Sequence, residues 1–176
     1  MGSEAINMAI SLTKGQKINL SKADGSQLTN ILIGLGWKEV QASGGLFGMF
    51  KQKVDVDIDA SVLMLDAGGK IPSPEEVIFF NHKDHATGCI HHCGDNLVGG
   101  KMGGMDDSEQ IQVDLTKVPQ GIERIVFVVN IYDCVKRKQH FGMVENAYIR
   151  IVDQGSQETI ASYNLTEDYS GKTSMI

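Results

Sequence analysis

The sequence predicts a mainly β protein built as a sandwich or a barrel. Short apolar or alternating runs recur along the chain, and glycine, proline and polar turn residues separate them. Alternation with a period of two is typical of strands, and many short strands of this kind favour a sandwich or a barrel. A chain of 176 residues can bury one sizeable core, so we expect a single domain over residues 1–176.

The predicted strands follow one another with turn signals between them. In chain order they are residues 8–12, 31–37, 54–65, 77–80, 89–92, 111–115, 125–132, 147–152 and 159–163. Turn signals stand at Gly68-Gly69 and at residues 72–74, 119–121 and 153–156. One short helix is predicted near residues 134–141, where Gly142 ends it.

Composition and charge exclude several classes of protein. With 41% hydrophobic and 22% charged residues, the chain belongs with soluble globular proteins rather than disordered or membrane proteins. A formal charge of -6 argues against nucleic acid as a partner. We expect no membrane insertion and no signal peptide, because no apolar run is long enough. Three cysteines are too few and too irregular for a disulfide framework, which favours the cytoplasm.

Three carboxylates stand at every second position of the strand predicted over residues 54–65. Asp55, Asp57 and Asp59 then leave from one face, about 7 Å apart, where each neighbouring pair repels by roughly 2 kcal/mol at an effective dielectric near 20. A hard divalent cation would remove this repulsion, whereas the alternative is a solvated polar face. The same face turns apolar at Leu63 and Leu65, so we expect the acids at a solvent-exposed rim.

A second group of oxygen ligands lies in the glycine-rich segment 94–109. Carboxylate and amide side chains can bind a cation there, while the glycines let backbone carbonyls turn inward. The alternatives are a disordered acidic loop and a phosphate-binding loop, but the segment lacks the phosphate-loop pattern. The ligand candidates of this segment are Asp95, Asn96, Asp106, Asp107 and Glu109.

Together these segments resemble the TerD family of tellurium-resistance and stress proteins. That family carries a D-x-D-x-D-A-S strand and a G-D-N-x-x-G loop leading to D-D-E. The resemblance extends over nearly the whole chain in the family's order. It is carried by residues 8–20, 35–37, 55–61, 77–81, 94–99, 113–119, 139–142, 144–151 and 163–168.

The resemblance implies an antiparallel β-sandwich that holds calcium between the acidic strand and the glycine-rich loop. One ion is implied, and the number of ligands would suffice for two. The chain departs from the family pattern at Lys101, Met102 and Met105, and Ser108 interrupts the D-D-E run, which weakens the case for the second ion. The implied ligands are Asp55, Asp57, Asp59, Asp95, Asn96, Gly99, Asp106, Asp107 and Glu109.

The family pattern also continues with further strands beyond the position of Ile176. We therefore expect a domain that is truncated at its C-terminus relative to the family, with an unpaired edge that would permit self-association. The implied partners, besides calcium, are other stress and tellurite-resistance proteins, including membrane-associated ones.

A cluster of histidines offers an alternative metal site. His82, His85, His91 and His92 lie close to Cys93 in the sequence, and imidazole and thiolate are ligands of zinc. The spacing is not that of a zinc finger, and His91 and His92 would point to opposite faces of a strand.

No catalytic motif is recognisable. A metal-dependent phosphoester hydrolase using the same acids is the chief enzyme alternative, but Arg124, Arg137 and Arg150 lie far from the acidic segments in the sequence. We therefore expect a non-enzymatic, calcium-responsive interaction module that acts in stress response or tellurite resistance.

Overall fold

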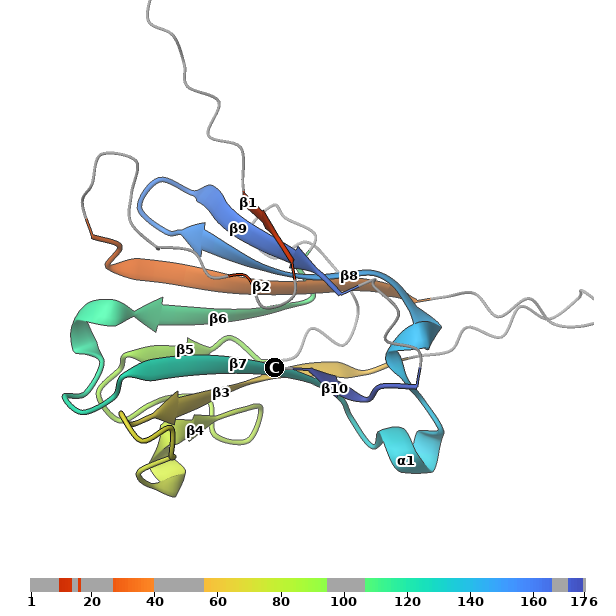
Figure 1. Cartoon of the computed structure of the whole chain (residues 1–176), viewed down its shortest axis with the longest axis horizontal. Coiled ribbons are helices and arrows are strands. Elements are labelled where there is room, and N and C mark those ends of the chain that lie inside the picture. Colours follow the sequence, from red (N-terminus) through yellow and green to blue (C-terminus); the bar gives the residue numbers. More distant parts are fainter. Residues whose placement is uncertain are drawn as a thin grey trace, which may run out of the picture.

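Two β-sheets face each other in the computed structural model, which describes residues 10–13, 16, 27–39, 56–94, 107–165 and 171–175 (Figure 1). The larger sheet has six strands in the order β1 (Ile10–Leu12), β9 (Glu158–Asn164), β8 (Val144–Asp153), β2 (Asn30–Glu39), β6 (Glu109–Asp114) and β5 (Ile90–His92). The smaller sheet has four strands in the order β10 (Ser174–Met175), β7 (Arg124–Ile131), β3 (Ile58–Leu65) and β4 (Val77–Ile78). The predicted β-sandwich is confirmed.

Strand pairing is antiparallel except at one edge of the larger sheet. There β1 runs parallel to β9, with Ile10 opposite Ala161. Each predicted strand segment contains an observed strand, although residues 8, 9, 54 and 55 lie outside the described residues. The sequence analysis missed β10, because two residues are too short to show a period.

The helical content of the described residues is smaller than predicted. The helix α1 covers Cys134–Arg137 only, since Lys138 adopts a left-handed conformation with φ 54° that ends it. Three short 3-10 segments lie at strand ends: η1 (Pro74–Glu76), η2 (Leu115–Lys117) and η3 (Phe141–Met143). No helix among the described residues is long and apolar enough to cross a membrane.

The core lies between the sheets and follows the predicted alternation. Ile31, Ile33 and Leu35 of β2 belong to the same buried cluster as the alternate residues Ile58, Ala60, Val62 and Met64 of β3. Between the inward residues of β2, Gly34 and Gly36 therefore belong to the outer face of the larger sheet.

The environment of the acidic face of β3 differs from the prediction. Asp59 is only 4% exposed, whereas Ser61, Leu63 and Leu65 on the same face are partly exposed. Asp59 pairs with Asn130 of β7, and Asn130 pairs in turn with Ser174 of β10. The acidic end of β3 therefore lies where three strands run side by side. The prediction that these acids lie at a solvent-exposed rim is wrong for Asp59.

Candidate functional site

The start of β3 carries the two described acids of the predicted strand row. Asp57 precedes the strand, and its carbonyl accepts a hydrogen bond from the Tyr132 amide at 2.9 Å. Its carboxylate is partly exposed and lies 3.9 Å from the Arg137 guanidinium. Asp59 follows inside the strand on the same face and is buried. The predicted strand geometry of these two acids is thus present, but one is buried and the other lies beside a cation.

Glu109 reaches from the larger sheet to the backbone of β3. The short strand β4 pairs with Val62 and Leu63 of β3, and no other described strand pairs with the neighbouring stretch of that edge. There the Ala60 amide donates a hydrogen bond to Glu109 Oε2 at 2.7 Å. Glu109 is 2% exposed, and the residue it contacts directly follows Asp59. The buried carboxylates of Asp59 and Glu109, which come from different sheets, are therefore both neighbours of the Ala60 backbone.

His92 satisfies the other polar group of Ala60. Its Nε2 lies 3.1 Å from the Ala60 carbonyl, and its Nδ1 accepts a hydrogen bond from the Gly94 amide at 3.0 Å. Because Nδ1 accepts, Nε2 carries the proton and donates to the carbonyl. Both ring nitrogens are therefore engaged, and Gly94, at one end of the glycine-rich segment, lies next to the acidic end of β3.

Asp107 is held by side chains of the larger sheet. Its Oδ1 accepts hydrogen bonds from Tyr148 Oη at 3.0 Å and from Arg150 Nε at 2.8 Å. Its Oδ2 accepts from Arg150 Nη2 at 2.5 Å and from Gln110 Nε2 at 3.0 Å. The carboxylate is fully buried, and the Arg150 side chain is 12% exposed. This bidentate pair is the kind of charge-assisted interaction that fixes orientation as well as position.

The outer face of β2 makes room for this network. A Cβ on Gly34 would lie 2.5 Å from Asp107 Oδ2, and a Cβ on Gly36 would lie 2.5 Å from the Tyr148 ring. In the sheet, Gly34 pairs with both Arg150 and Gln110, so these residues share its outer face. Asp107 therefore lies on the side of the larger sheet that faces away from β3.

The chain bends at Ser108, between Asp107 and the start of β6. Glu109, the residue after this bend, pairs with Leu35, an inward-facing core residue, and so points towards β3. The sequence predicted Asp107 and Glu109 together, as ligands of the same glycine-rich segment. The bend separates them.

Five predicted ligands remain. Asp55, Asp95, Asn96, Gly99 and Asp106 lie outside the described residues. Within the described ranges, no group of three or more histidine, cysteine or acidic side chains could hold a metal ion. Asp57, Asp59 and Glu109 carry hard oxygen donors of the kind that calcium prefers.

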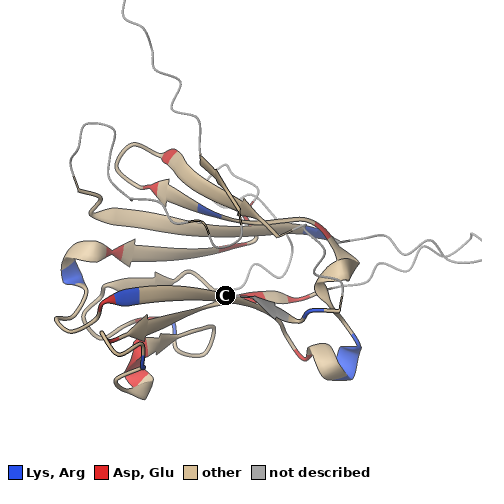
Figure 2. Ribbon diagram, in the orientation of Figure 1, with Lys and Arg blue, Asp and Glu red and all other residues tan. Residues whose placement is uncertain are grey.

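Two arginines lie closer to the acids than their sequence positions indicated. Arg150 pairs with Asp107, and Arg137 of α1 lies near Asp57 and stacks over the Tyr132 ring at 5.6 Å from its centroid. The basic colour on α1 is visible at one end of the sandwich (Figure 2). No local sequence pattern signals either contact, because each joins distant strands or loops.

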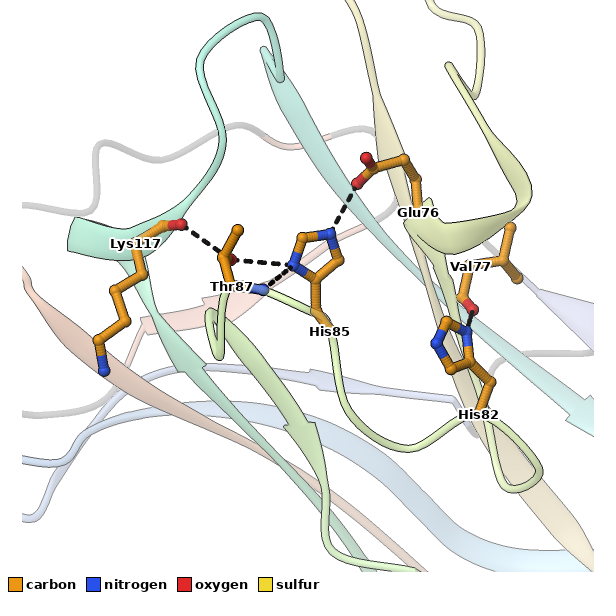
Figure 3. A network of polar contacts seen from close by, with 6 residues as sticks. All are labelled: Glu76, Val77, His82, His85, Thr87 and Lys117. Atoms are coloured by element: carbon orange, nitrogen blue, oxygen red, sulfur yellow. Dashed lines mark hydrogen bonds and ion pairs between the residues drawn. The ribbon is translucent and has the colours of Figure 1, made fainter.

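The histidine cluster does not converge on one point. His82 Nδ1 lies 2.8 Å from the Val77 carbonyl, while His85 Nε2 lies 3.1 Å from Glu76 and its Nδ1 2.9 Å from Thr87 (Figure 3). His91 Nδ1 lies 2.5 Å from Asp84 at the surface. Each imidazole thus has its own protein partner, and the described residues give no support to the alternative zinc site.

The cysteines of this region are free thiols. Burial raises the pKa of the Cys89 thiol and also that of the Cys93 thiol. The reactive thiolate form is therefore disfavoured at neutral pH, as expected for structural cysteines.

Comparison with known proteins gives a consistent match. The TerD domain model matches residues 8–176. Stress response protein SCP2 of Bacillus subtilis (strain 168) is 48% identical over 171 residues, which are 96% of this chain and 83% of that protein. The tellurium resistance protein TerD of an Alcaligenes species is 39% identical over 169 residues, 96% of this chain and 81% of that protein.

The fold has a counterpart among solved structures. A homologue of the telluride resistance protein TerD from Streptomyces coelicolor A3(2) superposes with a TM-score of 0.55 at 18% identity. The superposition covers 84% of this chain and 77% of that chain.

Proposed function

The chain belongs to the TerD family, whose relatives include tellurium-resistance and stress-response proteins, and on this premise we propose that it binds calcium at the acidic end of β3. The supporting observation is the contact between Glu109 and the Ala60 amide at 2.7 Å. Through it a buried carboxylate of the larger sheet meets the backbone beside Asp59 of the smaller sheet.

The charge balance at this position favours a cation. Buried carboxylates are costly unless a positive charge or several hydrogen bonds compensate them. The buried Asp59 directly precedes Ala60 and the buried Glu109 bonds to the Ala60 amide, while the partly exposed Asp57 stands two residues before Asp59. A calcium ion accepts six to eight oxygen ligands, so these three would need additional donors. We propose that Asp55, Asp95, Asn96, Gly99 and Asp106 contribute them.

The proposed role of the ion is to order the glycine-rich segment against β3. Both described ends of this segment are already linked to Ala60. Glu109 bonds to the Ala60 amide directly, and Gly94 is linked to the Ala60 carbonyl through His92. Calcium would then complete a surface for a partner, for which other stress or tellurite-resistance proteins are the candidates. In this proposal the protein acts by binding and performs no chemical step.

Thermal unfolding of chelator-treated protein tests the proposal. Calcium at a hundred times its dissociation constant stabilises the folded state by about 2.7 kcal/mol, so we expect a clear rise in Tm with calcium. The Asp57→Asn/Asp59→Asn variant should lose this rise relative to its own calcium-free Tm. Isothermal titration calorimetry would give the number of ions.

Asp84→Asn is the matched control, because Asp84 is an exposed acid in the histidine-rich region. It should keep the calcium-induced rise. A rise that persists in the double variant would remove these residues from the site. A rise with zinc alone would support the histidine alternative instead.

A further inference from the structure

We infer that Asp107 positions the acidic segment and does not bind calcium. This inference rests on the proposed calcium site and assigns a different role to one acid of the run. Asp107 and Glu109 are two residues apart, yet their side chains lie on opposite faces of the larger sheet. Only Glu109 is directed towards β3.

The first argument is the occupancy of the Asp107 carboxylate. Both of its oxygens accept two hydrogen bonds each, from Arg150, Tyr148 and Gln110. A calcium ion would have to replace these donors at about 2.3–2.6 Å from the same oxygens. It would also approach the guanidinium of Arg150, whose side chain is only 12% exposed, and the two positive charges would repel.

The second argument is the direction of the side chain. Asp107 packs over Gly34, whose missing Cβ would lie 2.5 Å from it, on the outer face of β2. Ile33 and Leu35, the neighbours of Gly34, face the core on the opposite side, where β3 lies. The body of the sheet therefore separates the carboxylate of Asp107 from Asp59.

The third argument is the effect of the Asp107–Arg150 pair on the position of Glu109. Asp107 is tied to β8 through Arg150, and the next residue, Ser108, donates its amide to the Leu35 carbonyl at 2.7 Å. These contacts fix the bend after which Glu109 turns inward. Asp107 thus acts on the calcium site through Glu109, as a positioning residue.

A double-mutant cycle in the full chain tests the inference, using Asp107→Asn, Arg150→Gln and the combination. Without calcium, each single variant should lower Tm by roughly 10 °C, because it leaves a buried charge without its partner. The combined variant should lose much less than the sum of the two, since it removes both charges. Asp59→Asn serves as the comparison that should lose the calcium-induced rise.

The calcium affinity of Arg150→Gln separates the two roles even if Asp107→Asn fails to fold. For a positioning residue, releasing Asp107 from Arg150 weakens calcium binding, because Glu109 is then less well held, and an unchanged affinity would overturn the positioning role. If Asp107 were a ligand, removal of the competing cation would tighten calcium binding, and that result would overturn the inference. Additive losses in the calcium-free cycle would overturn it as well. If calcium does not raise the Tm of the wild-type protein, the proposed function fails. The calcium-free cycle still measures the coupling between Asp107 and Arg150.

Discussion

The histidine-rich segment and the acidic end of β3 are the two regions in which the sequence indicated a metal site. The histidines are close in sequence, yet His82, His85 and His91 each bond to a different neighbour. Glu109 and Ala60 are 49 positions apart, yet they are in direct contact. Antiparallel strands bring distant residues together and send adjacent ones to opposite faces, so clustering in the sequence is poor grounds for a shared ligand.

The largest expected effect is on the free energy of unfolding when glycine is replaced by alanine, either beside Asp107 or in the histidine-rich segment. Gly34→Ala places a methyl group 2.5 Å from the buried Asp107 carboxylate, so the anchored network must shift, at a cost of about 3 kcal/mol. Gly88→Ala, in the histidine-rich segment, meets no atom within 4 Å and should cost about 1 kcal/mol for its φ of +68°. Urea unfolding would measure both. Equal losses would show that the surroundings of Asp107 are no more tightly packed than the histidine-rich segment.

Replacement of the adjacent histidines His91 and His92 should lower the free energy of unfolding by different amounts. His92 is 1% exposed and bonds to both Ala60 and Gly94, so His92→Ala should cost about 2–3 kcal/mol. His91 has a half-exposed side chain paired with Asp84, and His91→Ala should cost less than about 1 kcal/mol. Chemical denaturation of the two variants measures the difference. A large loss for His91→Ala would mean that the surface pair contributes more than its exposure allows.

The smallest expected effect concerns the thiols. Burial raises the pKa of Cys93, so its reaction with iodoacetamide at pH 7 should be slower than that of a cysteine in an unfolded control peptide, and it should speed up as the pH rises past the ordinary thiol value. Cys89, which is fully buried, should react only when the protein unfolds. Mass spectrometry of partly labelled protein measures each site. Fast labelling of Cys93 at pH 7 would revive a chemical role for the thiols.

The strands were predictable because alternation directly records which residues face the core. Val56, Ile58, Ala60 and Val62 are buried as the pattern of the acidic strand requires. The short length of α1 depends on the left-handed conformation of Lys138, which the sequence does not signal at a residue other than glycine or asparagine. The opposite directions of the Asp107 and Glu109 side chains depend on a single bend at Ser108, and strand periodicity carries no information about a residue just before a strand begins.

The span of the contacts at the acidic end bears on the order of folding. Glu109 bonds to a residue 49 positions away and His92 to one 32 positions away. In the histidine-rich segment, His91 and Asp84 are separated by 7 positions and His85 and Thr87 by 2. Closing long loops costs entropy that only extensive pairing repays, so short-range contacts can form first. We therefore expect the acidic end to assemble late, once both sheets are in place, so that its integrity reports on the completed fold.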